Sequence, residues 1–201
     1  MIARNPSVIY STFWRRVGAQ LLDIVVLLPV IALSIALNGL GRRAYVVTAV
    51  CMLFFNLWYR VFFVKRFGGT PGKLLVGMRI VQVNGFPVGY QQALLRYIVD
   101  LMLSIGVSIA LIAGALAMTD ADYALSNWHH RNAALLALAP NWYPWLSGLI
   151  QLWVLGLLIV MLTNSERRTT HDFIAGTVVI QKARSPDASD AAPEPPPLPT
   201  D

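Results

Sequence analysis

The sequence predicts an all-α polytopic membrane protein with four transmembrane helices and a small β element on its cytoplasmic face. Of its 201 residues, 56% are hydrophobic and only 13% are charged, whereas about 25% of residues in a soluble domain are charged. The mean hydropathy is +0.58, and four apolar segments reach the roughly 20 residues that span a bilayer. These values exclude an ordinary soluble globular protein.

The four predicted spans cover residues 17–37, 44–64, 98–118 and 143–163. Asp23 interrupts the first apolar segment and no small-residue cleavage site closes it, so the segment is not expected to be a cleavable signal peptide. Gly106, Ala110 and Gly114 recur every four residues in the third span, a spacing that allows close helix packing in lipid. Cys51, inside the second span, is expected to be a small packed residue.

The distribution of charge predicts the orientation. The formal net charge is +6, and 13 of the 16 Lys and Arg residues fall on one side of the predicted spans. Basic residues accumulate in cytoplasmic loops, so both termini are expected in the cytoplasm. Because the basic residues follow the topology of a membrane protein, nucleic acid is not expected as a partner. The expected partner is the lipid bilayer.

The outer loop between the third and fourth spans contains His129 and His130. Adjacent histidines without a nearby Cys do not have the usual spacing of metal ligands, so no metal site is expected there. The apolar run Ala133–Ala139 is too short to span a membrane and is interpreted as an interfacial or re-entrant piece.

The cytoplasmic loop at 65–97 contains an alternating segment at 79–83 followed by Asn84-Gly85, a pair typical of a tight β-hairpin. A β-branched run at 177–181 is a second candidate strand. An isolated hairpin is marginally stable without a third strand. Pairing of the two segments is therefore an arrangement that the pattern allows.

The chain divides by composition into a membrane domain at 1–184 and a tail at 185–201. The tail is rich in Pro, Ala and acidic residues, a composition typical of disordered segments.

The run Gly68–Lys73 invites comparison with a phosphate-binding loop. That motif requires a glycine where this chain has Phe67 and a Ser or Thr where it has Leu74. No Ser-His pair, paired carboxylates or His-Glu-x-x-His run supports catalysis elsewhere. Neither an enzyme activity nor a cofactor is therefore expected.

Five polar residues converge on the cytoplasmic ends of the spans, and they are Asp23, Asn56, Arg60, Arg96 and Asp100. At 1.5 Å per residue, Asp23 lies about 9 Å and Arg60 about 6 Å inside the cytoplasmic edge, so these two are expected to form a pair directly or through one water. Two interpretations remain open. The five residues either form a satisfied cluster that fixes helix register or line a path for an ion, proton or substrate.

Four blocks of the sequence, in order and spread over most of residues 13–181, resemble the RDD family of bacterial membrane proteins; they are Arg15–Asp23, Gly68–Arg79, Ala93–Tyr97 and His171–Val179. The arginine and two aspartates that give the family its name correspond to Arg16, Asp23 and Asp172. The outer loop and the tail carry none of these blocks.

The resemblance implies a bacterial inner-membrane protein. The family is suspected of transport, and cation/proton exchange is reported for some relatives, which makes Na⁺, K⁺ and H⁺ the expected small partners. A non-catalytic assembly or accessory protein of the membrane is the alternative. Because four short spans make a narrow monomer, a homo-oligomer or a complex with another membrane protein is expected.

Overall fold

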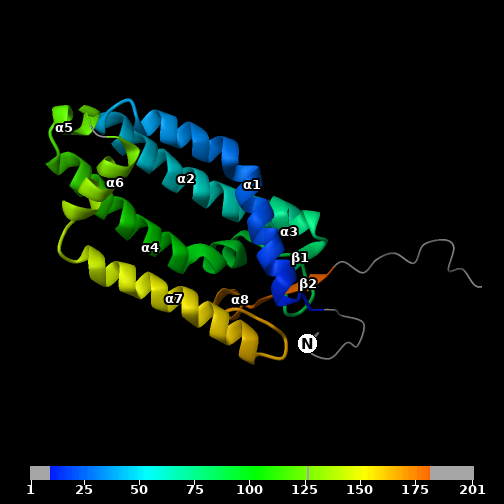
Figure 1. Cartoon of the computed structure of the whole chain (residues 1–201). Coiled ribbons are helices and arrows are strands. Elements are labelled where there is room, and N and C mark those ends of the chain that lie inside the picture. Colours follow the sequence, from blue (N-terminus) through cyan, green and yellow to red (C-terminus); the bar gives the residue numbers. More distant parts are fainter. Residues whose placement is uncertain (1–9, 126, 182–201) are drawn as a thin grey trace, which may run out of the picture.

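The structure, a computed structural model, describes residues 10–125 and 127–181. Four long helices form most of it, and they are α1 (Phe13–Asn38), α2 (Arg42–Phe67), α4 (Tyr90–Ala117) and α7 (Tyr143–Thr163) (Figure 1). Within the described ranges, these helices supply the four segments that are long and apolar enough to cross a membrane. The predicted fold of a polytopic helical membrane protein is confirmed.

Three of the four long helices, α1, α2 and α4, begin earlier than the predicted spans. α4 begins at Tyr90 rather than near Ile98, and α1 begins at Phe13 rather than near Val17. Their first turns are polar, with Arg15 and Gln91 among them. A hydropathy pattern excludes such turns from the membrane, although the helix continues through them. The connection between α2 and α4 is therefore shorter than the predicted loop at 65–97, because α2 ends at Phe67 and α4 begins at Tyr90.

One end of the bundle, here called the sheet end, carries α3 (Pro71–Leu75), β1 (Met78–Gln82), α8 (Thr170–Ala175) and β2 (Thr177–Gln181) (Figure 1). β1 and β2 pair antiparallel, with Ile80 opposite Val179. The two segments singled out in the sequence thus pair with each other. An isolated bridge joins Tyr10 to Ile180, so the first and last described residues lie at this same end.

The hairpin predicted at Asn84-Gly85 forms only its turn. The Gly85 amide donates to the carbonyl oxygen of Gln82 at 2.8 Å. The return segment lies within the described residues, but it forms a single β-bridge from Pro87 to Val81 and no strand. Proline has no amide hydrogen to donate to the next position of a ladder. The long-range partner β2 forms the ladder with β1 instead.

The opposite end carries α5 (Asp120–Leu125) and α6 (Trp128–Ala137) (Figure 1). The run Ala133–Ala139 forms the second half of α6 and the turn after it. A Cβ added to Gly114 would lie 2.4 Å from the carbonyl oxygen of Leu135, and one added to Gly106 would lie 2.8 Å from Leu146 on α7. The small residues of α4 therefore allow close packing, as their spacing predicts.

Buried apolar side chains gather at the two ends of the bundle, around Ile80 at one end and Tyr123 at the other. Between these clusters the helices present large apolar side chains outward, such as Val25 and Leu152, which suits contact with lipid. Cys51 also lies on such an outward face and is exposed. The prediction that it is packed inside the protein is therefore wrong. The predicted disordered tail at 185–201 lies outside the described residues.

Candidate functional site

The signature residue Asp172 joins elements that are far apart in the chain. Its carboxylate lies 3.3 Å from Nη1 of Arg16 at the start of α1, and it forms a second ion pair with Arg96 near the start of α4. Asp172 is fully buried. This ion-pair cluster fixes the ends of two membrane helices to α8 at the sheet end.

Threonines complete the contacts of the Asp172 carboxylate. Thr169 donates from both its amide nitrogen and its hydroxyl to Oδ2, each at 2.9 Å, and Thr177 on β2 donates to Oδ1 at 3.3 Å. The Arg96 guanidinium also donates to the Thr177 hydroxyl at 2.7 Å. Because both carboxylate oxygens have several donors, Asp172 is held in one geometry by helix and strand together.

The electrostatics of this cluster favour the ionised carboxylate. Burial by itself raises the pKa of Asp172, but the charges of Arg96 and Arg16 and the hydrogen bond from the Thr169 amide oppose burial. Their combined effect holds the pKa of Asp172 well below its ordinary range. Asp172 is therefore a permanent negative charge at neutral pH.

The second signature aspartate, Asp23, lies in a separate hydrogen-bonded cage and is only 6% exposed. Its Oδ1 accepts from the Tyr59 hydroxyl at 3.0 Å and from the Gly72 amide at 2.7 Å. Its Oδ2 accepts from the Thr70 hydroxyl at 2.5 Å. The short helix α3 and the turn before it thus fold back onto α1 and supply donors to a carboxylate inside the first span.

The absence of a side chain at Gly72 allows this arrangement. A Cβ at that position would lie 2.1 Å from the carbonyl oxygen of Ala19 and 2.9 Å from Cγ of Asp23. The Gly-Thr-Pro-Gly run therefore places two donors, the Thr70 hydroxyl and the Gly72 amide, against α1.

The predicted direct pair between Asp23 and Arg60 is wrong. No ion pair joins them in the part of the chain that the structure describes. The Asp23 oxygens are taken by Tyr59, Thr70 and Gly72, and the Arg60 guanidinium lies over the ring of Tyr97, 5.4 Å from its centroid. The two residues line one small cavity, but their charged groups contact other partners.

Arg60 instead lies where three cavities adjoin. The largest, about 440 Å³, lies between α2, α4 and α7, and Asn56, Arg60 and Asp100 line it. A second of about 70 Å³ is lined by Arg60, Arg96 and Asp100. A third of about 50 Å³ is lined by Asp23, Asn56 and Arg60. Each of the five polar residues singled out in the sequence therefore lines at least one of these adjoining cavities.

Asp100 makes the contacts nearest to acid–base chemistry. Its Oδ1 lies 3.1 Å from Nε2 of His171 and accepts a hydrogen bond from the indole of Trp153 at 2.9 Å. The rings of Trp153 and His171 meet edge to face, with centroids 5.2 Å apart. A carboxylate and an imidazole in contact beside a cavity can exchange or share a proton.

Sequence reasoning missed several residues that complete these sites. Tyr59, Thr70 and Gly72 had no role assigned, although a buried aspartate needs donors and a threonine before a short helix is a ready donor. Trp153 and His171 were also not linked to Asp100. Trp153 is 53 positions from Asp100 in the sequence and His171 is 71 positions from it. No local sequence pattern indicates contacts over such separations.

A comparison with curated proteins finds no match. The model of the RDD family matches residues 10–176, which include Arg16, Asp23 and Asp172 and all four long helices. The chain therefore belongs to the RDD family.

Proposed function

We propose that this membrane protein carries out cation- or proton-linked transport, with Asp100 and His171 as the groups that bind the transported or coupling ion. The observation that carries the proposal is the cavity of about 440 Å³ between α2, α4 and α7, with ionisable and hydroxyl side chains on its wall. Polar groups inside a membrane are costly and normally face a polar or hydrated space.

The polar residues of α4 follow one another along the cavity. Asp100, Ser104 and Ser108 are spaced four residues apart and all line it. At 1.5 Å per residue they extend over about 12 Å of the helix. A polar stripe of this length supports a path that enters the membrane from the sheet end and passes part of the way across.

The contacts of Asp100 support an exchange of ions at this position. Its hydrogen bonds with the described residues Trp153 and His171 both reach Oδ1, which leaves Oδ2 for a proton or a cation. A cation at Oδ2 and a proton on the Asp100–His171 pair repel each other. Such competition at one site is the simplest physical basis for exchange of a cation against a proton.

The location and assembly belong to the same proposal. We infer that the protein lies in the cytoplasmic membrane with both termini inside, because 10 of the 13 Lys and Arg residues within 10–125 and 127–181 fall on the sheet-end side of the spans. We also infer that it acts as an oligomer or with another membrane protein, because four spans enclose little space. The proposal assigns it no catalytic activity.

A specific observation favours the alternative of a non-transporting assembly or accessory protein. The two signature aspartates are buried and fully hydrogen-bonded, so neither is open to an ion. Their contacts fix helix ends, as a structural role requires.

Flux measurements separate the two candidates. The purified protein is placed in liposomes, and Na⁺, K⁺ and pH gradients are imposed in turn. Transport predicts flux by the unchanged protein and at least a tenfold loss in Asp100→Asn, with Asp120→Asn as the control because that carboxylate is exposed at the opposite end. Absence of flux under every gradient, with the protein folded and inserted, would favour the assembly role.

A further inference from the structure

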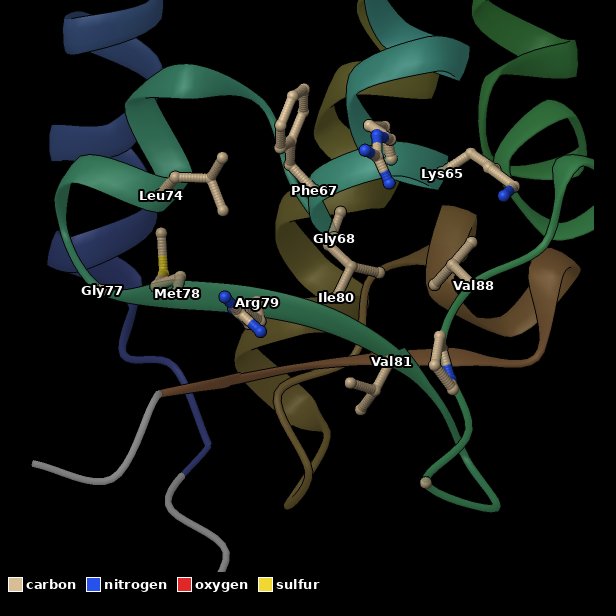
Figure 2. Close-up of a pocket in the computed structure, with 13 residues that line it drawn as sticks. Lys65, Phe67, Gly68, Leu74, Gly77, Met78, Arg79, Ile80, Val81 and Val88 are labelled. Carbon is tan, nitrogen blue, oxygen red and sulfur yellow. The ribbon is translucent and has the colours of Figure 1, made fainter. Parts of the chain in front are cut away.

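A separate cavity of about 490 Å³ lies at the sheet end, outside the three cavities around Arg60. Figure 2 shows Lys65 and Phe67 at the end of α2 on one side of it, and Met78 and Arg79 on β1 on the other. Val88 closes a further side. The cavity thus lies where a membrane helix ends and the small sheet begins.

The wall of this cavity is basic. Lys65, Arg66 and Arg79 line it, and none of the described residues on the wall is an Asp or Glu. All three side chains belong to exposed residues, and none of them takes part in an ion pair among residues 10–125 and 127–181. Lys65 lies over the ring of Tyr90, 5.3 Å from its centroid. Three cations on one cavity without a protein counter-charge favour an anionic ligand.

The rest of the wall is apolar. Phe67 is 46% exposed at the end of α2, and Leu74, Met78 and Val88 line the same cavity. A small soluble anion gains nothing from such surfaces, whereas a lipid brings an anionic head group and apolar chains together. The position at the end of a membrane helix places these cations at the depth of lipid phosphates.

The helix dipole accounts for two of the three cations. Lys65 and Arg66 lie in the last turn of α2, where positive charge compensates the negative end of the dipole. The dipole does not account for Arg79, which lies on β1. The stem of Arg79 passes beside Gly68, and this glycine has a left-handed φ of +78° that most side chains would resist. The turn at Gly68 thus brings β1 and Arg79 back beside the end of α2.

We propose that this cavity binds the phosphate head group of an anionic phospholipid from the adjoining leaflet. Arg79, with Lys65 and Arg66, holds the phosphate, and Phe67 and Leu74 contact the start of the acyl chains. Basic pockets beside membrane helices are a recognised setting for anionic head groups. The site is independent of the transport proposal, because it shares no lining residue with the cavities around Arg60.

The test uses the full-length purified protein, stripped of lipid in a neutral detergent, and native mass spectrometry. Phosphatidylglycerol and phosphatidylcholine with identical chains are titrated separately. We expect phosphatidylglycerol to bind more tightly, and the double variant Arg66→Gln/Arg79→Gln to lose about 25-fold in affinity for it. The loss corresponds to about fivefold for each basic residue near a membrane surface.

The matched control is Arg15→Gln/Arg167→Gln, which removes the same charge from exposed positions outside the cavity. It should keep the affinity within about twofold. An equal loss in the control, or equal affinity for the two lipids, would overturn the proposal. Tight binding of inorganic phosphate alone that displaces the lipid would assign the cavity to a soluble anion instead.

Folding of each variant is checked by gel filtration and circular dichroism. If the double variant is misfolded, the single variant Arg79→Gln provides the same test with an expected loss of about fivefold. Its side chain lies on an exposed strand position. An unchanged affinity in a folded Arg79→Gln protein would contradict the proposal.

Discussion

The guanidinium of Arg16 and the carboxylate of Asp172 lie 3.3 Å apart although 156 positions separate them in the chain. Arg16 lies in the first turn of the first membrane helix, and Asp172 lies on α8, after the last one. Arg96 of α4 forms an ion pair with the same carboxylate. One buried acid on α8 therefore connects the first and third membrane helices. The arginine and one of the two aspartates of the family name are thus direct partners.

Asp172→Asn should strongly destabilise the protein. The change leaves Arg16 and Arg96 without a counter-charge at a site where their side chains are only 12% and 11% exposed. Breaking a buried pair by removing one partner costs roughly 3–5 kcal/mol. Thermal unfolding in detergent measures the loss, and Asp120→Asn is the control because its carboxylate is 69% exposed in its pair with Arg42. Similar losses in the two variants would contradict this role of Asp172.

The contribution of Asp172 to stability should depend on pH in a defined direction. Its pKa is lowered in the folded protein, so the ionised form stabilises the fold at every pH above the ordinary value of about 4. As the pH falls below about 4, the unfolded state takes up the proton first and the stabilisation is lost. The difference in unfolding temperature between the wild-type protein and Asp172→Asn should therefore be constant from about pH 8 to about pH 5 and shrink below about pH 4. A difference that grows on acidification would have the wrong sign.

Asp23→Asn should destabilise the protein by about 1–3 kcal/mol, because an amide group turns one acceptor into a donor that faces other donors. Adding Arg60→Gln should not restore stability, since Arg60 lies over Tyr97 and is not the partner of Asp23. Thr70→Val, which removes one of the three donors, should cost about 1 kcal/mol. Thermal unfolding of the three variants tests this, and full rescue in the double variant would restore the ion-pair interpretation.

The membrane architecture could be predicted from the sequence because a membrane span requires a long apolar run, which is visible in the sequence. A run of about 20 apolar residues is rare outside membrane spans, and α7 has the predicted bounds, Tyr143–Thr163. The pairing of β1 with β2 was foreseen only as an allowed arrangement. Strand propensity marks both segments but carries no information on which segment pairs with which.

The partners of the buried acids could not be predicted in the same way. Depth along a helix follows from residue number, but direction around the bundle depends on how the helices pack. Tyr59 and Arg60 are neighbours in sequence, yet Tyr59 reaches Asp23 and Arg60 reaches Tyr97. The donors from α3 could not be predicted either, because a helix of five residues is too short to show a helical period of apolar residues.

Gly72→Ala should be far more damaging than Gly18→Ala. The added methyl at position 72 would stand 2.1 Å from a backbone oxygen of α1, whereas position 18 has nothing within 4 Å among the described residues. Overpacking of this kind typically costs about 1–3 kcal/mol, and it would also pull the Gly72 amide from Asp23. Gly18→Ala, within α1, should leave stability unchanged or raise it. Thermal unfolding of both variants is the measurement, and equal stabilities would show that α3 does not pack closely on α1.

The last prediction concerns orientation, which follows from the 10 basic residues that the described part of the chain carries on the sheet-end side of the spans. Single cysteines at Asn84 and His129 probe the two ends of the bundle, because both residues are exposed and lie in the sheet-end loop and in α6 respectively. Both are made in a Cys51→Ser background, since Cys51 is itself exposed. A membrane-impermeant thiol reagent should label His129→Cys in intact cells, and Asn84→Cys only after the membrane is permeabilised. The reverse pattern would invert the topology, and labelling of both positions from outside would contradict a span between them.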